Sequence, residues 1–427
     1  MKFRYGKKGL DISLNPDWNI TIIKAKKQKV IKNPLELIKK KINDPIGTAS
    51  LTDIINQKKP CDQVCIVVSD ATRPVPSKVI IKAVVAHLNE NGITDDKILV
   101  LVATGLHRAS YEEEIDRILG RSLKERVKYI DHNPNNKDSI VFLGETENKI
   151  PIYINKHYYN SDLKILTGYV EPHFFFGFSG GRKSIVPGIA GAKTIQENHS
   201  AKNINSPFAR FGIYNDNPMA KISTEIAKLV GVDFIVNVCI NEKHEITKVA
   251  AGGLEEVHRS LVDYQLHYIF EEINEPFDIV ICGNGGYPLD LNLYQAVKSM
   301  ALGELVVKKR GTIISVNECA DGIGKGHVDF KKLLFSNIEP SQIYNGILNK
   351  EIIIPDQWEI QILARILMKA EIYVVSSLKK KELGNIGLKY AKTIEEAIKK
   401  SLAKHGKSAK ILILPDGPQI IPRLRNS

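Results

Sequence analysis

The residues from Glu171 to His199 concentrate side chains that could carry out chemistry. They read EPHFFFGFSGGRKSIVPGIAGAKTIQENH, with His173 before a Gly/Ser turn, Lys183 at its exit and His199 after a short helical run. Backbone N–H groups and cations converge in such a turn, which suits an anionic group such as a phosphate. The two histidines add the capacity for proton transfer or metal ligation. This combination indicates an active-site segment.

The turn nearly fits the phosphate-binding P-loop pattern G-x4-G-K-S. Residues 177–184 depart from it because Arg182 occupies the position of the second glycine. No acidic strand end of the kind that binds magnesium in nucleotide hydrolases stands out, so we reject that class. Lys183 remains a candidate nucleophile or anion ligand. The alternative is a basic turn that only binds an anion.

Two further clusters directly follow apolar runs. Asp70 and Arg73 lie in the sequence SDATRP, where the carboxylate could accept a hydrogen bond and the guanidinium could bind a carboxylate or phosphate. The alternative is a helix cap followed by a solvated arginine. His107 lies in TGLHR and could reach a cleft, or it could be a packed or surface histidine.

The C-terminal half contains two more candidate clusters. The turn GNGGYP precedes Tyr294, Gln295 and Lys298, which share one face of a predicted helix. The turn is a weak fragment of a dinucleotide fingerprint, and the helical face could simply be solvated. Trp358, one of two tryptophans, is more often a core or interface residue than a cofactor-stacking one.

Short apolar runs alternate with helical patterns, which predicts an α/β fold with mostly parallel sheets. The strands are expected to be buried on both faces, because their residues do not alternate strictly. Predicted strands are Gln63–Ser69, Ile98–Ala103, Leu163–Tyr169, Phe234–Cys239, Phe277–Cys282, Thr312–Val316, Glu371–Val375 and Lys410–Leu414. Predicted helices are Ser77–Asn89, Tyr111–Leu119, Ala220–Val230, Leu254–Phe270, Leu293–Met300 and Thr393–His405.

A chain of 427 residues is expected to form two domains. The charged link 271–276 contains Pro276 and separates a long helix from a new strand. We therefore expect an N-terminal domain over residues 1–272 that binds the cofactor and carries out catalysis, and a C-terminal α/β domain over 273–427. The final IPRLRNS could be a loose tail or could dock back on the first domain.

Composition narrows the class of protein. The chain carries a formal net charge of +12 and only 7% aromatic residues, without a nucleic-acid motif, so we expect a protein that acts on small anions rather than on nucleic acid. No run resembles a signal peptide or a membrane span, which predicts a cytoplasmic protein. The five cysteines fit no disulfide framework, and Cys65, Cys239 and Cys282 are expected to be buried thiols.

Taken in order, the clusters resemble the nickel-pincer nucleotide-dependent lactate racemase family. The pattern is D-x-T-R-P, G-x-H-R, E-P-H with S-G-G-R-K, N-H, Y-Q-A-V-K and Q-W, and the resemblance extends to LPDGPQIIP near the end. No single piece is specific, but the joint pattern is. The resemblance implies two α/β domains with the active site in the cleft between them.

The resemblance also implies a cofactor and roles for the site residues. The cofactor is a nickel-pincer nucleotide, pyridinium-3,5-bisthiocarboxylic acid mononucleotide, linked covalently to Lys183, and its nickel is held by His199. His107 and His173 would be the acid/base residues, and Arg73 or Lys298 would hold the substrate carboxylate. Residues implied to line the cofactor and substrate site are Asp70, Arg73, Ser179, Gly180, Gly181, Tyr294, Gln295, Lys298 and Trp358.

The implied reaction is racemisation of a 2-hydroxy acid, with D- and L-lactate the leading substrates. Hydride transfer avoids a carbanion, and two histidines suit the two enantiomers. A racemase or epimerase of malate or a longer-chain acid is the alternative, and Phe174–Phe176 either favour a small aliphatic substrate or serve packing. An NAD-dependent dehydrogenase and a non-catalytic nickel- or anion-binding protein are the remaining rivals. Other proteins would have to build and load the cofactor.

Overall fold

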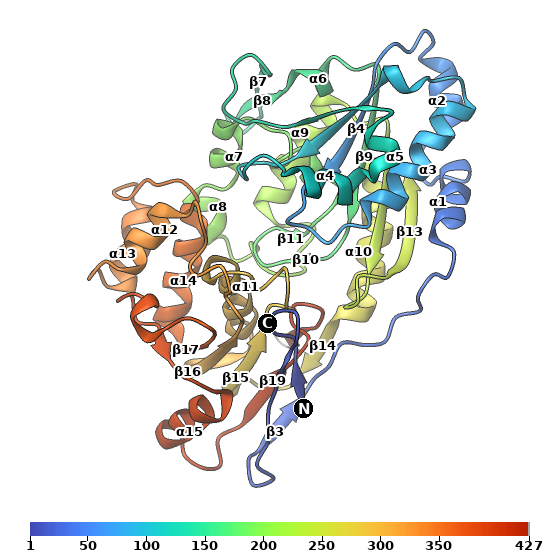
Figure 1. Cartoon of the computed structure of the whole chain (residues 1–427). Coiled ribbons are helices and arrows are strands. Elements are labelled where there is room, and N and C mark those ends of the chain that lie inside the picture. Colours follow the sequence, from blue (N-terminus) through green and yellow to red (C-terminus); the bar gives the residue numbers. More distant parts are fainter. Residues whose placement is uncertain (426–427) are drawn as a thin grey trace. The chain divides into compact units, whose positions relative to one another are not determined.

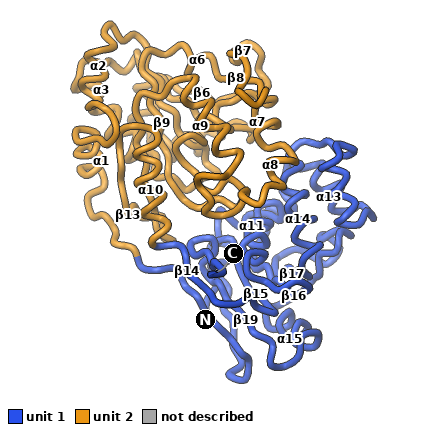
Figure 2. Tube along the Cα trace, turned by 180° about the vertical axis from the view of Figure 1, so that it is seen from behind, with its two compact units in different colours: residues 1–27, 268–427 blue, residues 28–267 orange. Residues whose placement is uncertain are grey.

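The structure, a computed structural model, describes residues 1–425. The chain forms two compact units: unit 2 is Gln28–His267, and unit 1 combines Met1–Lys27 with the residues from Tyr268 onward (Figure 2). Each unit contains a six-stranded sheet, and nearly all strand pairs in the two sheets are parallel. The predicted α/β class with mostly parallel sheets is therefore confirmed.

The units divide the chain differently from the expected domains. The C-terminal unit begins at Tyr268, close to the expected start at residue 273, but the first 27 residues belong to it as well. The reason is β3 (Ile20–Ile22), which pairs with β19 (Ile411–Leu414) and forms an edge of the sheet of unit 1. The first residues of the chain therefore complete the unit formed by the last ones.

The chain end that the sequence left open also belongs to unit 1. Strand β20 (Ile421–Leu424) pairs in parallel with β14 (Phe270–Ile273), so Phe270 lies opposite Ile421. The stretch beginning at Ile421 is thus a paired strand as far as Leu424. Residues 426–427 lie outside the described part of the chain.

In unit 2 the strand order is β13-β12-β9-β4-β5-β6, and only the β12–β13 pair is antiparallel. Figure 1 labels β4, β9 and β13 of this sheet. The strands are β4 (Val64–Ser69), β5 (Ile98–Ala103), β6 (Lys128–Asp131), β9 (Leu163–Tyr169), β12 (Phe234–Ile240) and β13 (Ile246–Gly252). The shorter strands are β7 (Ile140–Glu145), β8 (Pro151–Asn155), β10 (Pro172–His173) and β11 (Gly177–Phe178). The helices are α1 (Pro34–Asn43), α2 (Leu51–Gln57), α3 (Ser77–Glu90), α4 (Glu112–Leu119), α5 (Arg121–Lys124), α6 (Lys156–Tyr159), α7 (Ala192–Asn198), α8 (Ala201–Asn205), α9 (Pro218–Val230), α10 (Leu254–Ile269) and the 3₁₀ turns η1 (Asp95–Lys97) and η2 (Gly181–Ser184).

Strand β4 shows why these runs are apolar without alternation. Ile66 and Val68 pack into the main core of unit 2, while Cys65 and Val67 point to the opposite face and are also fully buried. A strand covered on both faces needs an apolar residue at every position. The prediction of strands buried on both faces is correct here.

In unit 1 the strand order is β18-β17-β16-β15-β19-β3, and all neighbours are parallel. Its other strands are β15 (Phe277–Gly283), β16 (Val307–Val316), β17 (Glu371–Val375), β18 (Lys389–Tyr390) and the pair β1 (Lys2–Phe3) and β2 (Leu10–Asp11). The helices are α11 (Leu293–Glu304), α12 (Val328–Leu334), α13 (Pro340–Leu348), α14 (Gln357–Lys369), α15 (Ile394–His405) and the 3₁₀ turn η3 (Lys380–Glu382).

Helices cover both faces of this sheet too. Ile281 of β15 shares a core with Ile398 of α15. The next residue, Cys282, faces the other side, where its thiol donates a hydrogen bond to the Ser299 carbonyl of α11 over 3.0 Å.

The predicted strands and helices are all present, with ends shifted by at most a few residues in most cases. Helix α14 is among the elements that the sequence did not reveal. It begins after Asp356, which has the left-handed conformation (φ 54°), and no side chain caps its first turn. The sequence does carry a start signal of a helix there, Asp356 followed three residues later by Glu359, and it was overlooked.

All five cysteines are free and buried, which confirms the prediction for Cys65, Cys239 and Cys282. In the part of the chain that the structure describes, no group of three or more His, Cys, Asp or Glu residues could hold a metal ion. No helix among residues 1–425 has both the length and the apolar character needed to cross a membrane.

A tight hairpin carries His173. In it β10 pairs with β11, so that His173 lies opposite Gly177. Gly177 has a φ of +80°, and a Cβ atom there would lie 2.0 Å from the carbonyl oxygen of Ile213. The hairpin can approach residues 212–213 this closely only because residue 177 is glycine.

This contact generates a stability prediction. Gly177→Ala should lower the free energy of unfolding by about 3 kcal/mol or more, because the backbone must shift as well as adopt a strained φ. The matched control is Gly92→Ala, where φ is +85° but no atom lies within 4 Å of the added Cβ. That variant should lose only about 1 kcal/mol. Urea unfolding at neutral pH measures both losses, and equal losses would contradict the close contact.

A buried histidine, His132, holds the segment that follows Lys183. Its Nε2–H donates to the Ala190 carbonyl over 2.9 Å, and its Nδ1 accepts from the Asn155 amide over 3.2 Å. This assignment of the ring proton follows from the two partners. Burial lowers the pKa of His132 to about 4, an effect that the hydrogen bond to Ala190 only partly offsets. The ring is therefore neutral at neutral pH.

A pH dependence of stability follows. The pKa of His132 falls from its ordinary value of 6.5 to about 4 on folding. The unfolded chain therefore takes up a proton that the folded one does not between these pH values, and the free energy of unfolding falls as the pH falls. One such proton contributes about 1.4 kcal/mol per pH unit. His132→Gln should reduce the slope between pH 4 and 6.5 by about that amount in urea titrations of the apoprotein. An unchanged slope would show that His132 does not titrate in this way.

Candidate active site

The predicted site residues of unit 2 follow three neighbouring strands. Asp70 follows β4, His107 lies four residues beyond β5, and His173 lies four residues beyond β9. Because β4 pairs in parallel with both β5 and β9, the carboxyl ends of these strands lie at the same edge of the sheet. Ligands in open α/β sheets bind at that edge.

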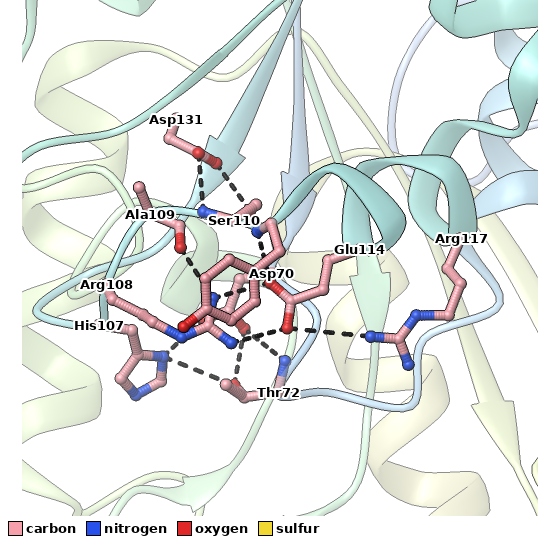
Figure 3. Close-up of polar contacts among 10 residues, drawn as sticks. Asp70, Thr72, His107, Arg108, Ala109, Ser110, Glu114, Arg117 and Asp131 are labelled. Atoms are coloured by element: carbon pink, nitrogen blue, oxygen red, sulfur yellow. Dashed lines mark hydrogen bonds and ion pairs between the residues drawn. The ribbon is translucent and has the colours of Figure 1, made fainter. Parts of the chain in front are cut away.

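Asp70 and His107 form a hydrogen-bonded pair (Figure 3). The Nδ1 atom of His107 lies 2.6 Å from Oδ2 of Asp70, and the other carboxylate oxygen accepts from the hydroxyl of Thr72 over 2.7 Å. Burial alone would raise the pKa of Asp70, but His107, Arg73 and Thr72 together hold the pKa of that carboxyl below its usual value. An ionised Asp70 accepts the Nδ1 proton and leaves Nε2 as the basic nitrogen of the neutral ring.

The loop that carries His107 is fixed by its own contacts. The guanidinium of Arg108 donates to both carboxylate oxygens of Glu114 over 2.8 Å, and Ser110 donates its N–H and hydroxyl to Asp131 over 2.8 Å each (Figure 3). Arg108 is thereby bound to the first turn of α4. The His107 side chain stays 39% exposed, whereas that of Asp70 is only 8% exposed. The pair thus consists of a buried anchor and an accessible ring.

His173 is buried among aromatic rings. Its ring centre lies 5.0 Å from Phe174 and 4.6 Å from Phe175, edge-on to the latter. The backbone N–H of Phe176 donates to Nδ1 of His173 over 3.3 Å. Phe174–Phe176 are themselves buried and pack around the histidines, and their influence on the substrate stays a prediction.

His199 is held as a neutral ring. It follows α7, and its Nδ1–H donates to the Ile195 carbonyl over 3.1 Å, which leaves the lone pair on Nε2. Burial, together with the charge of Lys183, lowers the pKa of His199 to about 3. Phe175 and Phe176 also pack against this ring, at 5.3 and 6.0 Å between ring centres. Neutral imidazole is the form that binds a metal.

The turn before Lys183 is compact because of its glycines. Gly180 and Gly181 have positive φ, and a Cβ at Gly180 would lie 2.7 Å from the Tyr169 carbonyl oxygen. The Ser179 hydroxyl donates to the same carbonyl over 3.1 Å, and the amine of Lys183 lies 4.5 Å above the ring of Phe176. Here the glycines permit close contact with protein atoms. Their role toward a bound anion stays a prediction.

Unit 1 holds the other predicted residues. Tyr294, Gln295 and Lys298 lie on α11, and Lys298 donates to the side-chain oxygen of Gln295 over 2.5 Å. Trp358 lies in the first turn of α14. Each unit therefore contains its own group of predicted site residues. The sequence pattern predicts that both groups serve one reaction.

Sequence reasoning missed His327 in this unit. Its ring stacks on Tyr294 at 3.6 Å between centres, and its Nδ1 lies 3.2 Å from Oδ2 of Asp356. His327 ends the Gly-rich stretch DGIGKGH that follows β16. Its place after a strand end was the one sequence signal that could have revealed it.

Two family models match this chain. The model described as the lactate racemase N-terminal domain matches residues 5–212, and the one described as the lactate racemase C-terminal domain matches residues 273–421. A lactate racemase of Thermoanaerobacterium thermosaccharolyticum is 36% identical over 98% of both chains. A lactate racemase of Lactiplantibacillus plantarum is 38% identical over 90% of both chains.

Solved structures agree. The lactate racemase apoprotein of Thermoanaerobacterium thermosaccharolyticum superposes with a TM-score of 0.91 at 34% identity over 99% of both chains. A crystal structure of a Thermotoga maritima protein shares the fold with a TM-score of 0.68 at 20% identity, over 92% of this chain and 98% of that one. The family models and the relatives along nearly the whole chain show that this protein belongs to the lactate racemase family, a family of isomerases.

Proposed function

We propose that this chain interconverts D- and L-lactate and that His107 and His173 are its acid/base residues. The observation that carries the proposal is the 2.6 Å contact between His107 and the ionised Asp70 at the carboxyl edge of the sheet. A carboxylate that accepts Nδ1–H orients the ring and leaves Nε2 to face the substrate as the acceptor nitrogen. The accessible ring can then take a proton from a substrate hydroxyl.

Two histidines suit the inversion of a 2-hydroxy acid. The Cα–H of lactate is very weakly acidic, so a side chain is a poor base for it. The nickel-pincer nucleotide, when bound, supplies a hydride acceptor and donor in its place. His107 removes the hydroxyl proton when one enantiomer is the substrate, and His173 removes it when the other one is. In each direction the second histidine gives a proton to the product. An imidazole suits both tasks near neutral pH.

The residues present fit the proposed cofactor. His199 offers a neutral ring with its lone pair on Nε2, and it would be the protein ligand of nickel. Residues 1–425 contain no cluster of three or more His, Cys, Asp or Glu that could hold a bare ion, so the remaining ligands would belong to the nucleotide. The amine of Lys183 acts electrostatically on His199 and would carry the covalent link. The pincer's carbon and sulfur donors with one imidazole suit nickel.

Cations would hold the substrate while its centre inverts. Arg73 lies beside the Asp70–His107 pair, where its charge lowers the pKa of Asp70. Lys298 of unit 1 is oriented by Gln295. Either cation can hold the lactate carboxylate. Ser179, Gly180, Gly181, Tyr294, Gln295 and Trp358 are proposed to line the cofactor and the substrate.

We also propose that the reaction depends on other proteins and takes place in a reducing compartment. The cofactor must be built and loaded by other proteins. Five buried free thiols suit a reducing compartment, so we place the reaction in the cytoplasm.

The decisive test is chiral conversion of lactate by protein that carries the cofactor. We expect conversion in both directions without added NAD, together with a covalent mass adduct and bound nickel. The control Lys183→Ala should lack both the adduct and the conversion. Malate and longer 2-hydroxy acids are assayed in parallel. Turnover of one of them without turnover of lactate would mean that this acid, and not lactate, is the substrate. If protein that carries the cofactor converts none of the acids, the racemase proposal is refuted.

The Asp70–His107 contact generates a second test. Asp70→Asn should lower kcat at least about hundredfold while the cofactor stays bound, because an amide can present N–H to Nδ1 and favour the wrong tautomer. The matched control is Asp131→Asn, which alters a carboxylate that holds the same loop through Ser110 but does not touch His107. That variant should retain kcat within a few-fold. Equal losses in the two variants would mean that Asp70 only stabilises the loop.

A further inference from the structure

Arg182 is a buried cation with an unused binding edge. Only 5% of the residue is exposed, and its Nη1 lies 3.0 Å from Nδ1 of His258. Its Nε and Nη2 atoms have no hydrogen-bond partner among the described residues. A buried donor without a partner is costly, and a buried charge without a counter-ion more so.

The unused edge is the one with which arginine binds an oxyanion. Nε and Nη2 point the same way and match the two oxygens of a carboxylate or phosphate. This chain uses that edge elsewhere: Arg365 donates from Nε and Nη2 to the two oxygens of Glu304, at 2.9 and 2.7 Å. Arg126 does the same with Asp95, at 2.8 and 3.1 Å. At Arg182 no carboxylate of residues 1–425 takes this place.

The neighbours of Arg182 do not neutralise it. The Nε2–H of His258 donates to the Ser179 carbonyl over 2.8 Å, so its Nδ1 accepts from Arg182. Burial and the charge of Arg182 lower the pKa of His258 to about 3, which keeps that ring neutral. Tyr214 favours the charged form of Arg182 more than Glu255 does, but it is not a carboxylate, and the Glu255 carboxylate pairs with Lys228 at 2.5 Å. Burial lowers the pKa of Arg182, yet arginine keeps its charge in proteins.

Arg182 lines a cavity of about 690 Å³ in unit 2. Tyr214 and Arg259 line the same cavity, and both guanidinium groups lie over the Tyr214 ring, at 4.8 Å for Arg182 and 4.6 Å for Arg259. The glutamates in the wall lie toward solvent or are engaged, such as Glu225, which accepts the backbone N–H of Glu147 over 2.8 Å. Of the charged residues that line this cavity, Arg182 is the buried one, whereas Arg259 is exposed.

We propose that this cavity binds a small oxyanion, a carboxylate or a phosphate, between Arg182 and Arg259. Tyr214 is half-buried and covers both guanidinium groups, so its side chain moves aside to admit the ion. Arg182 is next to Lys183 in sequence, but its side chain has a separate set of neighbours: His258, Tyr214 and Arg259. It does not depend on the proposed racemase reaction.

Calorimetric titration of the apoprotein tests this site. The probes are inorganic phosphate and malonate, which is not a 2-hydroxy acid, at constant ionic strength. We expect saturable one-to-one binding of at least one probe. Binding of phosphate alone assigns a phosphate ligand, binding of malonate alone a carboxylate, and binding of both a general oxyanion site. Absence of saturable binding of either probe overturns the proposal.

Variants separate this site from other basic surfaces. Arg182→Lys keeps the charge but removes the two-nitrogen edge and should weaken binding at least tenfold, and Arg259→Gln should do the same. Tyr214→Ala should bind at least as tightly as the unaltered protein because it uncovers the edge. The control Arg117→Gln removes an equal charge from α4, outside the cavity, and should leave affinity unchanged. Should Arg182→Lys fail to fold by circular dichroism, Arg259→Gln decides alone. Equal affinity in Arg259→Gln and Arg117→Gln overturns the proposal.

Discussion

The parallel pairing of β4 with β5 and β9 is the constraint on which the candidate site of unit 2 depends. It brings the segments after these strands to one edge of the sheet, so that Asp70, His107 and His173 share an edge although they are far apart in the chain. The strands can lie in the middle of the sheet because every residue from Val64 to Val68 is buried and apolar. The polar side chains of the candidate site therefore follow the buried residues of these strands.

Burial then gives the site's histidines different states. His107 is accessible and rests on a buried carboxylate, whereas His199 is enclosed and donates to a backbone carbonyl. The enclosed ring is kept neutral because a low-dielectric surrounding and the charge of Lys183 both disfavour a second proton. One residue type is thus proposed to serve as a proton acceptor in one place and as a metal ligand in another. His132 and His258 show the third outcome, in which a neutral ring joins loops through two hydrogen bonds.

The stretch 173–183 serves packing and chemistry together. Phe175 and Phe176 contact both His173 and His199, so the same rings that fill the core also hold the two imidazoles. Gly177 and Gly180 allow the backbone to pass within contact of neighbouring carbonyls. Arg182 is the exception in this stretch, because its charge is buried without an acidic partner. A buried charge without an acidic partner costs stability.

The sequence by itself determined the α/β class, the positions of most long strands and helices, and the candidate residues at strand ends, because these depend on local patterns of apolar and polar residues. It also carried the family resemblance. Only the tertiary structure decided that Asp70 holds His107, that Phe176 donates to His173 and that residues 1–27 complete unit 1, because these contacts join segments whose spacing along the chain is uninformative. The same holds for His327 on Tyr294 and His258 on Arg182. Protonation states were likewise beyond the sequence, because they depend on how much water each ring loses on folding.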